Sequence, residues 1–481
     1  MLRNVVSFER VWMETRAPSR SARALTSFVQ FIEQRLGAKF VYDTASIGYE
    51  SIDLMPLFEL AEALHKKGVI DGYGRNFRLP DDPPIAHWYA RYRVEGTDKL
   101  STGITLDDNK LSLLIALAEA LERYVWFKCV DQFHALRVSS LKEIAAHENI
   151  IHPSRFVGHT ESQIQKHPAL QCGPQSIFTW VQGYSWTKKK EVWVPAQIVS
   201  GHKTLRAFKS STSEPVIRTS ITTGLALHPQ KIKALLSGAL EVIERDAYMI
   251  MWLNQLSLPR IDLEELCKRN RTLEKLVTRC RRYRFEPHAV RLITDAPTHA
   301  VCVVLEDMSG MLPRFVLGLK AHQDLSYAVE RALIEALGSH TKNSTAHTST
   351  WNSKNIADMT PQNRLTYWIE KDHGDRLSFL VKGDLSSCAP EAWETDTDEE
   401  HFERIIAWCR KQGYELASVS HTKTKVNVPK WNIESVVIPE LQPMNLFERI
   451  PSIGGTRLRD IPLQFGYTSR EPYVDEPHPF S

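Results

Sequence analysis

A short charged motif, Glu-x-x-Glu-Arg, occurs twice in this 481-residue chain and constrains its fold more than any other feature. The two copies are Glu119-Ala-Leu-Glu122-Arg123 and Glu241-Val-Ile-Glu244-Arg245. Apolar residues recur at helical spacing around each copy, so the two glutamates lie on one face of a helix with the arginine beside them. Each helix therefore offers two anionic ligands and one cation.

A partial third copy, Ala332-Leu-Ile-Glu335-Ala-Leu, keeps the apolar frame and the first glutamate of the motif. Gly338 and Ser339 replace the second glutamate and the arginine. Mg²⁺ takes oxygen ligands and commonly bridges carboxylates to phosphates, while arginine binds phosphate oxygens in a fork. If the three helices converge, they form a site for a metal ion and a nucleotide.

The alternative is that each motif lies on a solvated helix face, where local ion pairs contribute about 0.2 to 0.5 kcal/mol each. That interpretation suits a single copy, because charged residues are mostly exposed. Repetition within strongly apolar helices favours burial instead. A buried carboxylate needs a nearby cation or a bound proton.

Further motifs accompany these helices along the chain. They are Trp180-Val-Gln-Gly183-Tyr184-Ser185, Val194-Pro-Ala196, Thr222-Thr223-Gly224-Leu225-Ala226, Gly318-Leu-Lys-Ala-His322 and Val436-Val-Ile-Pro439-Glu440-Leu441-Gln442-Pro443. Together with the three helices, they resemble the YcaO family of ATP-dependent enzymes that modify peptide backbones. The resemblance extends over roughly residues 86–481.

This resemblance implies an α/β (α+β) fold of the YcaO ATP-binding type, with a mostly antiparallel sheet packed against helices, and it implies ATP and Mg²⁺ as cofactors. The implied metal ligands are Glu119, Glu122, Glu241, Glu244 and Glu335. The implied cofactor-binding residues are Glu119, Glu122, Arg123, Thr223, Glu244 and Arg245. The implied catalytic residues are Glu241, Arg245 and Ser481.

The chemistry implied by the family is activation of a peptide amide. A Cys, Ser or Thr side chain of a ribosomally synthesised precursor peptide adds to a backbone carbonyl, ATP phosphorylates the resulting oxyanion, and loss of phosphate leaves an azoline. The resemblance thus implies a role in making bacteriocins with thiazole or oxazole rings, which form from azolines by a further two-electron oxidation. Thioamide formation with external sulfide is the nearest alternative. The partners implied are the precursor peptide, a separate leader-binding protein and a second copy of the chain in a homodimer.

The end of the chain favours azoline formation. It reads Glu476-Pro-His-Pro-Phe-Ser481, which is similar to the Pro-x-Pro-x-Pro tail that azoline-forming members use near their active site. The alternative is a frayed, proline-stiffened terminus.

Several positions depart from the family pattern. Thr223 stands where the family has asparagine, and Gly338 and His340 stand where many members have Gln and Arg. These departures support a rival of another class, a catalytically silent scaffold that binds nucleotide or a partner. Retention of five motif glutamates argues against a silent scaffold. Closely spaced carboxylates repel one another, and a scaffold without activity has little physical reason to keep them.

Composition excludes several classes of protein. The net charge of +3 is small for a nucleic-acid-binding protein. No long apolar run spans a membrane and no secretory segment begins the chain, so we expect a cytoplasmic protein. None of the seven cysteines forms a Cys-x-x-Cys pair, which argues against a zinc ribbon or a disulfide framework. The chain has no Gly-x-x-x-x-Gly-Lys-Ser/Thr loop, so ATP use is inferred from the resemblance and the acidic helices.

The periodicity predicts a mixed N-terminal region over residues 1–85, which could bind a partner, and a YcaO domain with a proline-containing tail over residues 86–481. The expected helices are 22–36, 57–67, 109–130, 229–250, 262–282, 324–342 and 400–411. The expected strands are 40–42, 299–305 and 314–319, with a hairpin around the solvated turn Lys188-Lys189-Lys190.

Overall fold

The structure, a computed structural model, describes residues 54–76, 83–94, 96–128, 135–201, 214–310, 313–345, 374–386, 388–421, 431–446 and 448–480, and positions 356, 359, 364, 367 and 368. The helix expected at 22–36, the strand expected at 40–42 and Ser481 lie outside this part of the chain. No helix among the described residues is long and apolar enough to cross a membrane.

The chain divides into two compact units. One unit contains residues 1–76 and 85–121, and the other contains residues 77–84 and 122–481. The division falls between Leu121 and Glu122, inside helix α5 (Asn109–Lys128), which confirms the helix expected at 109–130.

The first unit contains an antiparallel sheet in the order β1-β2-β3. Its elements are α4 (Met55–Lys66), β1 (Gly72–Arg75), β2 (Ala86–Val94), β3 (Thr97–Thr105) and the first part of α5. Leu57, Ala61 and Leu64 are buried at helical spacing, so α4 is the amphipathic helix expected at 57–67. The Ser101 hydroxyl in β3 donates to the Ala116 carbonyl in α5 at 2.8 Å, which ties the sheet to this helix.

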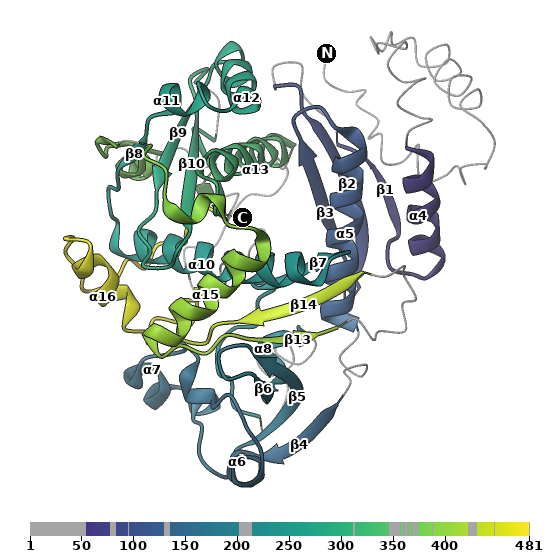
Figure 1. The fold of residues 1–481 in the computed structure, drawn as a ribbon, viewed down its shortest axis with the longest axis vertical. Coiled ribbons are helices and arrows are strands. Elements are labelled where there is room, and N and C mark those ends of the chain that lie inside the picture. The colour runs from purple at the N-terminus through teal and green to yellow at the C-terminus, as the bar shows by residue number, and fades with distance from the viewer. Residues whose placement is uncertain are drawn as a thin grey trace. The chain divides into compact units, whose positions relative to one another are not determined.

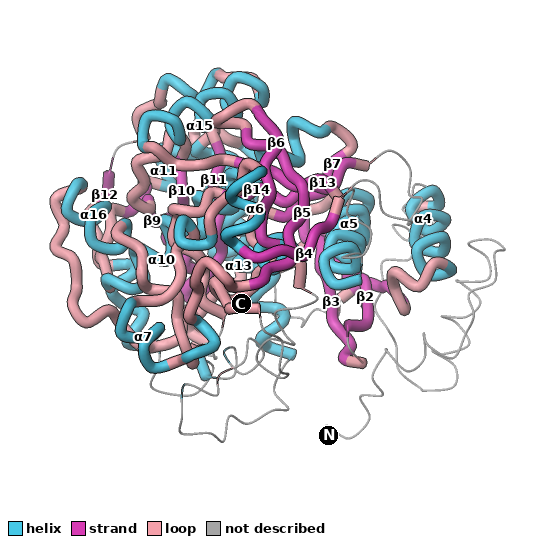
Figure 2. Tube along the Cα trace, turned by 90° about the horizontal axis from the view of Figure 1, so that it is seen from below, coloured by secondary structure: helices cyan, strands magenta, loops and turns pink. Residues whose placement is uncertain are grey.

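The second unit contains two further sheets. One has the order β4-β5-β13-β14-β7 with β6 paired to β5, and the other has the order β11-β10-β9-β8-β12 (Figure 2). Only the two-residue pairing of β12 with β8 is parallel among the described strands, so the mostly antiparallel architecture is confirmed. The strands are β4 (Leu136–Ser140), β5 (Ile177–Ser185), β6 (Lys190–Pro195), β7 (Leu225–His228), β8 (Arg260–Ile261), β9 (Phe285–Arg291), β10 (His299–Asp307), β11 (Phe315–His322), β12 (Leu385–Ser386), β13 (Ala417–Ser420) and β14 (Asn432–Val437).

The α-helices of this unit are α6 (Leu141–His147), α7 (Glu161–Lys166), α8 (Ala196–Val199), α10 (Lys231–Asn254), α11 (Leu263–Cys267), α12 (Arg271–Arg282), α13 (Leu325–Thr345), α15 (Asp398–Gln412) and α16 (Arg457–Gln464). Short 3-10 helices occupy Pro153–Arg155, Pro168–Leu170, Gly374–Val381 and Ala392–Thr395.

Helix α10 is the centre of the second unit. It packs on β14 and β7 of one sheet and on β11 and β10 of the other, while α13 packs on β11 and β10 (Figure 1). Its C-terminal half is buried on all sides from Asp246 to Asn254, as expected for a helix enclosed by two sheets. The second Glu-x-x-Glu-Arg motif directly precedes this buried half, with Glu244 buried and Glu241 and Arg245 partly exposed.

The single helix expected at 262–282 is wrong, because the structure has two helices there. The Asn270 side chain accepts hydrogen bonds from the Thr272 and Leu273 N–H groups and so begins α12 as an N-cap. Asp262 caps α11 in the same way. Apolar periodicity continues across the break, since Leu266 and Leu273 are both buried, and this conceals the second cap from a sequence pattern.

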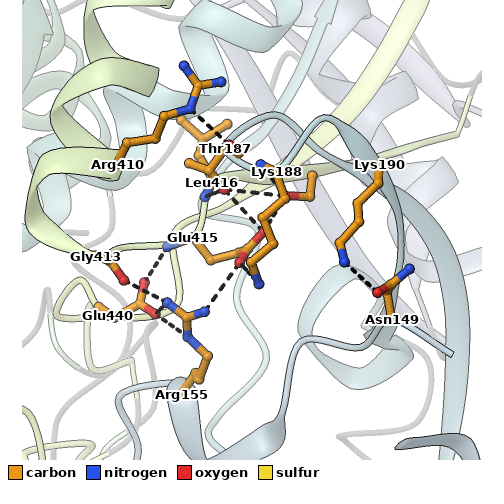
Figure 3. A network of polar contacts seen from close by, with 11 residues as sticks. Asn149, Arg155, Thr187, Lys188, Lys190, Arg410, Gly413, Glu415, Leu416 and Glu440 are labelled. Carbon is orange, nitrogen blue, oxygen red and sulfur yellow. Dashed lines mark hydrogen bonds and ion pairs between the residues drawn. The ribbon is translucent and has the colours of Figure 1, made fainter.

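The expected hairpin and its solvated turn are confirmed, because Lys188, Lys189 and Lys190 are all exposed between the paired strands β5 and β6. The Glu415 side chain is only 1% exposed, and it pairs with Lys188 at 2.5 Å and with Arg155 at 3.2 Å (Figure 3). Lys190 donates to the Asn149 side chain at 2.5 Å. The turn is thus held against the segment that leads into β13.

A buried ion pair joins α10 to the C-terminal part of the chain. The Asp246 carboxylate is fully buried and accepts from the Arg457 guanidinium at 2.7 and 2.9 Å, and from the Gln442 N–H at 2.7 Å. Arg457 also donates to Asp295 at 2.8 Å. Because this charge is well paired, the pair fixes α16 and the turn after β14 on α10.

Close contact between β11 and α13 requires Gly318. A Cβ added there would lie 1.9 Å from the Ala332 carbonyl oxygen and 2.6 Å from the Ala336 nitrogen. We therefore predict that Gly318→Ala lowers the free energy of unfolding by about 3 kcal/mol, at the upper end of overpacking costs. Gly173 is the matched control, because nothing lies within 4 Å of its added Cβ. Chemical denaturation of both variants checks this, and equal midpoints would contradict it.

The Asp246 pair makes a second prediction. Asp246→Asn leaves Arg457 buried with less than its full charge compensation, so we expect a loss of about 3 kcal/mol in the free energy of unfolding. Asp460→Asn is the control, because the Asp460 pair with Arg459 at 2.8 Å is exposed and should contribute less than about 1 kcal/mol. Urea unfolding of the two variants measures the difference, and similar losses would show that burial of the Asp246 pair is unimportant.

Candidate active site

Four motif glutamates each accept a hydrogen bond from a backbone N–H on, or next to, the end strand of a sheet. The bonds are Thr102 N to Glu119 Oε2 at 3.0 Å, Gly224 N to Glu241 Oε2 at 3.1 Å, Ala321 N to Glu244 Oε2 at 2.8 Å and Leu319 N to Glu335 Oε2 at 2.7 Å. Thr102 lies in β3, Gly224 directly precedes β7, and the other two donors lie in β11. One oxygen of each carboxylate is thereby fixed in orientation by a charge-assisted hydrogen bond.

The loop before β7 has a backbone that only glycine suits. Gly224 has φ +87°, and a Cβ added there would lie 2.1 Å from the Val436 carbonyl oxygen. The Gly224 carbonyl in turn accepts from the Val436 N–H at 2.8 Å. The loop is therefore fixed between β14 and α10, with Thr223 next to the amide that binds Glu241.

Arg245 lies among the carboxylates of the second unit. Its Nη2 donates to Glu241 Oε1 at 3.2 Å, and its Nε lies 3.7 Å from Glu244 Oε1. Nη1 lies 2.9 Å from the Met444 sulfur. Nε has no hydrogen-bond partner within the part of the chain that the structure describes. This guanidinium thus retains a donor for a ligand.

Two of these carboxyl groups bind a proton more readily than an ordinary glutamate does, because their pKa values are raised. Burial raises the pKa of Glu244, although the cations of Lys320 and Arg245 act against this shift. Burial, and then the negative charge of Glu244, raise the pKa of Glu335 to about 7. Two neighbouring carboxyls with raised pKa values indicate a place where a bound cation would restore ionisation.

The donor set suits Mg²⁺ better than a metal held by protein alone. Among the described residues, no three His, Cys, Asp or Glu side chains are close enough together to enclose a metal ion. Mg²⁺ usually keeps water molecules and binds through one or two carboxylates together with substrate phosphates. Oriented glutamate oxygens beside a guanidinium fit that pattern.

The structure brings together part of the predicted set. Glu241, Glu244, Arg245 and Glu335 form one cluster in the second unit, and Thr223 adjoins Glu241 through Gly224. Three other members lie on α5: Glu119 in the first unit, and Glu122 and Arg123 just after the division. All three are partly exposed. Ser481 lies outside the described residues.

The C-terminal tail is packed on α10, so the frayed terminus considered as an alternative is wrong for residues 476–480. His478 and Phe480 are buried, and both rings contact Tyr248. The Trp252 indole donates to the Glu476 carbonyl at 3.1 Å. The Phe480 ring lies 5.0 Å from the Arg245 guanidinium carbon. The tail therefore ends beside the motif arginine.

Sequence patterns did not single out several residues that surround this cluster. Lys320 acts on the Glu244 charge from β11, while Met444 and Phe480 contact Arg245 from distant parts of the chain. Lys320 could have been found, because it lies inside the Gly318-to-His322 motif between the two residues whose N–H groups bind glutamates. Met444 and Phe480 carry no local signal, since only tertiary packing brings them to α10.

The departure at His340 has a packing role. The His340 ring lies 4.7 Å from the Phe285 ring, and its Nε2 lies 3.6 Å from Asp307 Oδ2.

Cysteines in the described residues form no disulfide. Burial raises the pKa of the Cys280 thiol to about 12, which suits a core residue better than a nucleophile.

Comparison with solved structures shows that this fold is shared with known enzymes. A heterocyclase in complex with substrate and cofactor superposes with a TM-score of 0.68 at 19% identity, covering 87% of this chain and 57% of its own. This chain thus spans little more than half the length of that protein. YcaO from Methanopyrus kandleri, bound with AMPPCP and Mg²⁺, gives a TM-score of 0.56 at 18% identity, covering 81% of this chain and 90% of its own.

The Escherichia coli microcin synthetase McbBCD complex with pro-MccB17 bound contains a third similar chain. It gives a TM-score of 0.54 at 12% identity and covers 85% of this chain and 96% of its own. No curated protein matches the sequence. The family model described as YcaO cyclodehydratase, ATP- and Mg²⁺-binding, matches residues 107–442. That match includes α5, α10 and α13, so the chain belongs to the YcaO family, whose members bind ATP and Mg²⁺.

Proposed function

We propose that this protein is the cyclodehydratase component of an ATP- and Mg²⁺-dependent system that converts Cys, Ser or Thr of a ribosomally synthesised precursor peptide into azolines. The observation that carries the proposal is the cluster of Glu241, Glu244, Arg245 and Glu335, in which the Glu244 and Glu335 carboxyls have raised pKa values and Arg245 pairs with Glu241. Membership of the family supports the same cofactors.

The proposed reaction explains why such a cluster is useful. An amide oxygen is a poor leaving group, and bound ATP supplies the phosphoryl group with which that oxygen departs as phosphate. The substrate side chain loses its proton and closes the ring on the amide carbon. Within the protein, Glu241, Glu244 and Glu335 are the candidate ligands, of which one or two would hold each Mg²⁺ together with phosphate oxygens, and Arg245 would offset the charge on those oxygens. Glu119, Glu122, Arg123 and Thr223 are proposed to complete the cofactor site.

The packed tail supports azoline formation over thioamide formation with external sulfide. The Phe480 ring lies against Arg245, so residues 476–480 are placed to help position the reacting amide. We extend this proposal to Ser481 as a catalytic group. The precursor peptide and a leader-binding protein are the proposed partners, and residues 1–85 are the proposed docking region. The peptide-bound microcin synthetase complex is a precedent among the similar structures.

Turnover tests the proposal directly. With MgATP, a candidate precursor peptide and its partner protein, we expect phosphate release together with loss of one water mass from the peptide. Glu241→Gln should slow both by about 100-fold, a usual effect of removing a group that stabilises transition-state charge. Glu399→Gln is the control, because Glu399 is exposed in the first turn of α15 and should leave the rate unchanged.

The outcomes separate the alternatives. If the peptide exchanges one oxygen for sulfur when sulfide is present, the enzyme forms a thioamide and the azoline proposal is wrong. If the protein binds nucleotide without turnover when competent partners are present, the catalytically silent scaffold is the remaining explanation. Equal rates for Glu241→Gln and wild type would remove this cluster from the mechanism.

The raised pKa of Glu335 predicts how stability depends on pH without Mg²⁺. Its pKa of about 7 in the folded state lies above the ordinary value of 4.5, so the folded protein binds this proton more tightly than the unfolded chain does. The resulting stability is complete below pH 4.5 and is lost as the pH rises through 7, by at most about 1.4 kcal/mol per pH unit. Glu335→Gln should remove this loss.

Denaturant unfolding in EDTA at pH 4.5, 6 and 7.5 measures the effect. Glu330→Gln is the matched control on the same helix, and it should keep the pH dependence of the wild type. If Glu335→Gln and wild type lose stability in parallel over this range, the carboxyl does not titrate as predicted.

A further inference from the structure

Arg218 lies in a backbone segment that is fixed on both sides. The Val216 N–H donates to the Ala169 carbonyl at 2.9 Å, and the Ile217 N–H donates to the Gln197 side chain at 2.9 Å. After Arg218, the Ser220 hydroxyl donates to the Ser200 carbonyl at 3.0 Å. The position of the arginine is therefore set by the fold and is not that of a free surface side chain.

The Arg218 guanidinium has no acidic partner among the described residues. Its guanidinium carbon lies 5.5 Å from the centroid of the Phe156 ring. The side chain is mostly buried, and burial lowers its pKa to about 10. Arg457 and Arg364 illustrate the usual arrangement, since both are buried against carboxylates. A desolvated cation without a counter-ion calls for an anion from elsewhere.

Arg218 lines a small pocket beside the proposed active site, with room in this structure for about one water molecule, so a larger ligand enters only if the walls move apart. The other walls include Thr223, Val242, Val436, Gln442 and Pro443. Thr223 directly precedes the glycine that binds Glu241, Val242 directly follows Glu241, and Pro443 directly precedes the methionine that contacts Arg245. The pocket therefore adjoins the cluster without containing any of its charged residues.

Gln442 adds an unsatisfied acceptor to the same wall. Its side chain is 1% exposed, and its Nε2 donates to the Ser452 carbonyl at 2.6 Å. Its Oε1 has no hydrogen-bond partner in the described part of the chain. Native proteins rarely leave such atoms unpaired, so the pocket combines an unpaired cation, the Thr223 hydroxyl and an unpaired amide oxygen.

We infer that Arg218 and Thr223 form an oxyanion subsite beside the Glu241–Arg245 cluster, with Gln442 able to accept a proton-bearing group of the same ligand. The ligand chemistry is a carboxylate or a phosphate, which a guanidinium binds through two parallel hydrogen bonds. The inference rests on the proposed function for its biological meaning: a phosphate would be the released product or a nucleotide group, and a carboxylate would belong to the peptide.

Binding of two small probes to the full chain tests the subsite. Isothermal titration with inorganic phosphate, and separately with acetate, is run without ATP or peptide, and KCl keeps the ionic strength constant. We expect the wild type to bind at least one probe, and Arg218→Gln to weaken that binding at least tenfold. Arg218→Lys keeps the charge but loses the fork, so it should bind with intermediate affinity.

Arg314→Gln is the matched control. Arg314 also lies over a phenylalanine ring, at 4.8 Å from the Phe315 centroid, but it is paired with Glu306 at 2.8 Å. This variant should bind the probes as the wild type does. Thermal unfolding in probe-free buffer should give Arg218→Gln a midpoint equal to or above that of the wild type, because the variant removes an unpaired, desolvated charge.

Each outcome decides the inference. Arg218-dependent binding that favours phosphate assigns the subsite to the nucleotide or product, and binding that favours acetate assigns it to the peptide. Binding of neither probe, equal binding in Arg218→Gln, or a large loss of thermal stability in that variant would overturn the subsite. Because no turnover is required, failure of the proposed reaction would not be mistaken for failure of this inference.

Discussion

The hydrogen bond between a strand-edge N–H and a motif glutamate is the contact on which the site depends. A carboxylate that accepts from a backbone amide has a fixed orientation, and the bond is stronger than one between neutral groups. The amide also gains a partner, so the outer edge of β11 does not remain open to pairing with another strand. This one interaction therefore gives the strand-edge N–H group a partner and sets the orientation of the second carboxylate oxygen.

That arrangement brings like charges together at a cost. Glu244 and Glu335 both bind to β11, from α10 and α13 respectively, and their mutual repulsion contributes to the raised pKa of Glu335. Desolvation adds to the cost, because buried carboxylates lose their water. Arg245 and Lys320 offset part of it. A stable fold can tolerate such a cluster when the remaining charge is neutralised by protons or by a bound cation, which links the stability of the core to ligand binding.

Local patterns predicted the helices and the residue types of the site, but not the contacts between distant segments. The motif on α10 was visible because its glutamates, arginine and apolar frame lie within one helix. The break between α11 and α12 was missed because Asn270 acts as a cap only through its side-chain geometry, while the apolar spacing continues. Arg218 was also missed. Its significance is that no acidic side chain pairs with it among the described residues, and a sequence does not show which side chains lie near an arginine. Buried pairs such as Asp246 with Arg457 join positions too far apart in the chain for periodicity to connect them.

Packing of the tail restricts how Arg245 can meet a ligand. The Phe480 ring covers one face of the guanidinium, and such a cation–π contact leaves the N–H groups in the plane of the guanidinium available. Glu241 occupies one of these groups and the Met444 sulfur lies against another, whereas Nε has no hydrogen-bond partner in the described residues. A ligand must therefore approach along the edge of the guanidinium, where Nη1 and Nη2 each carry a second N–H group. The tail and the carboxylates thus both contact the Arg245 guanidinium. Removal of the tail would change the shape of the site and the directions from which a ligand can reach this guanidinium.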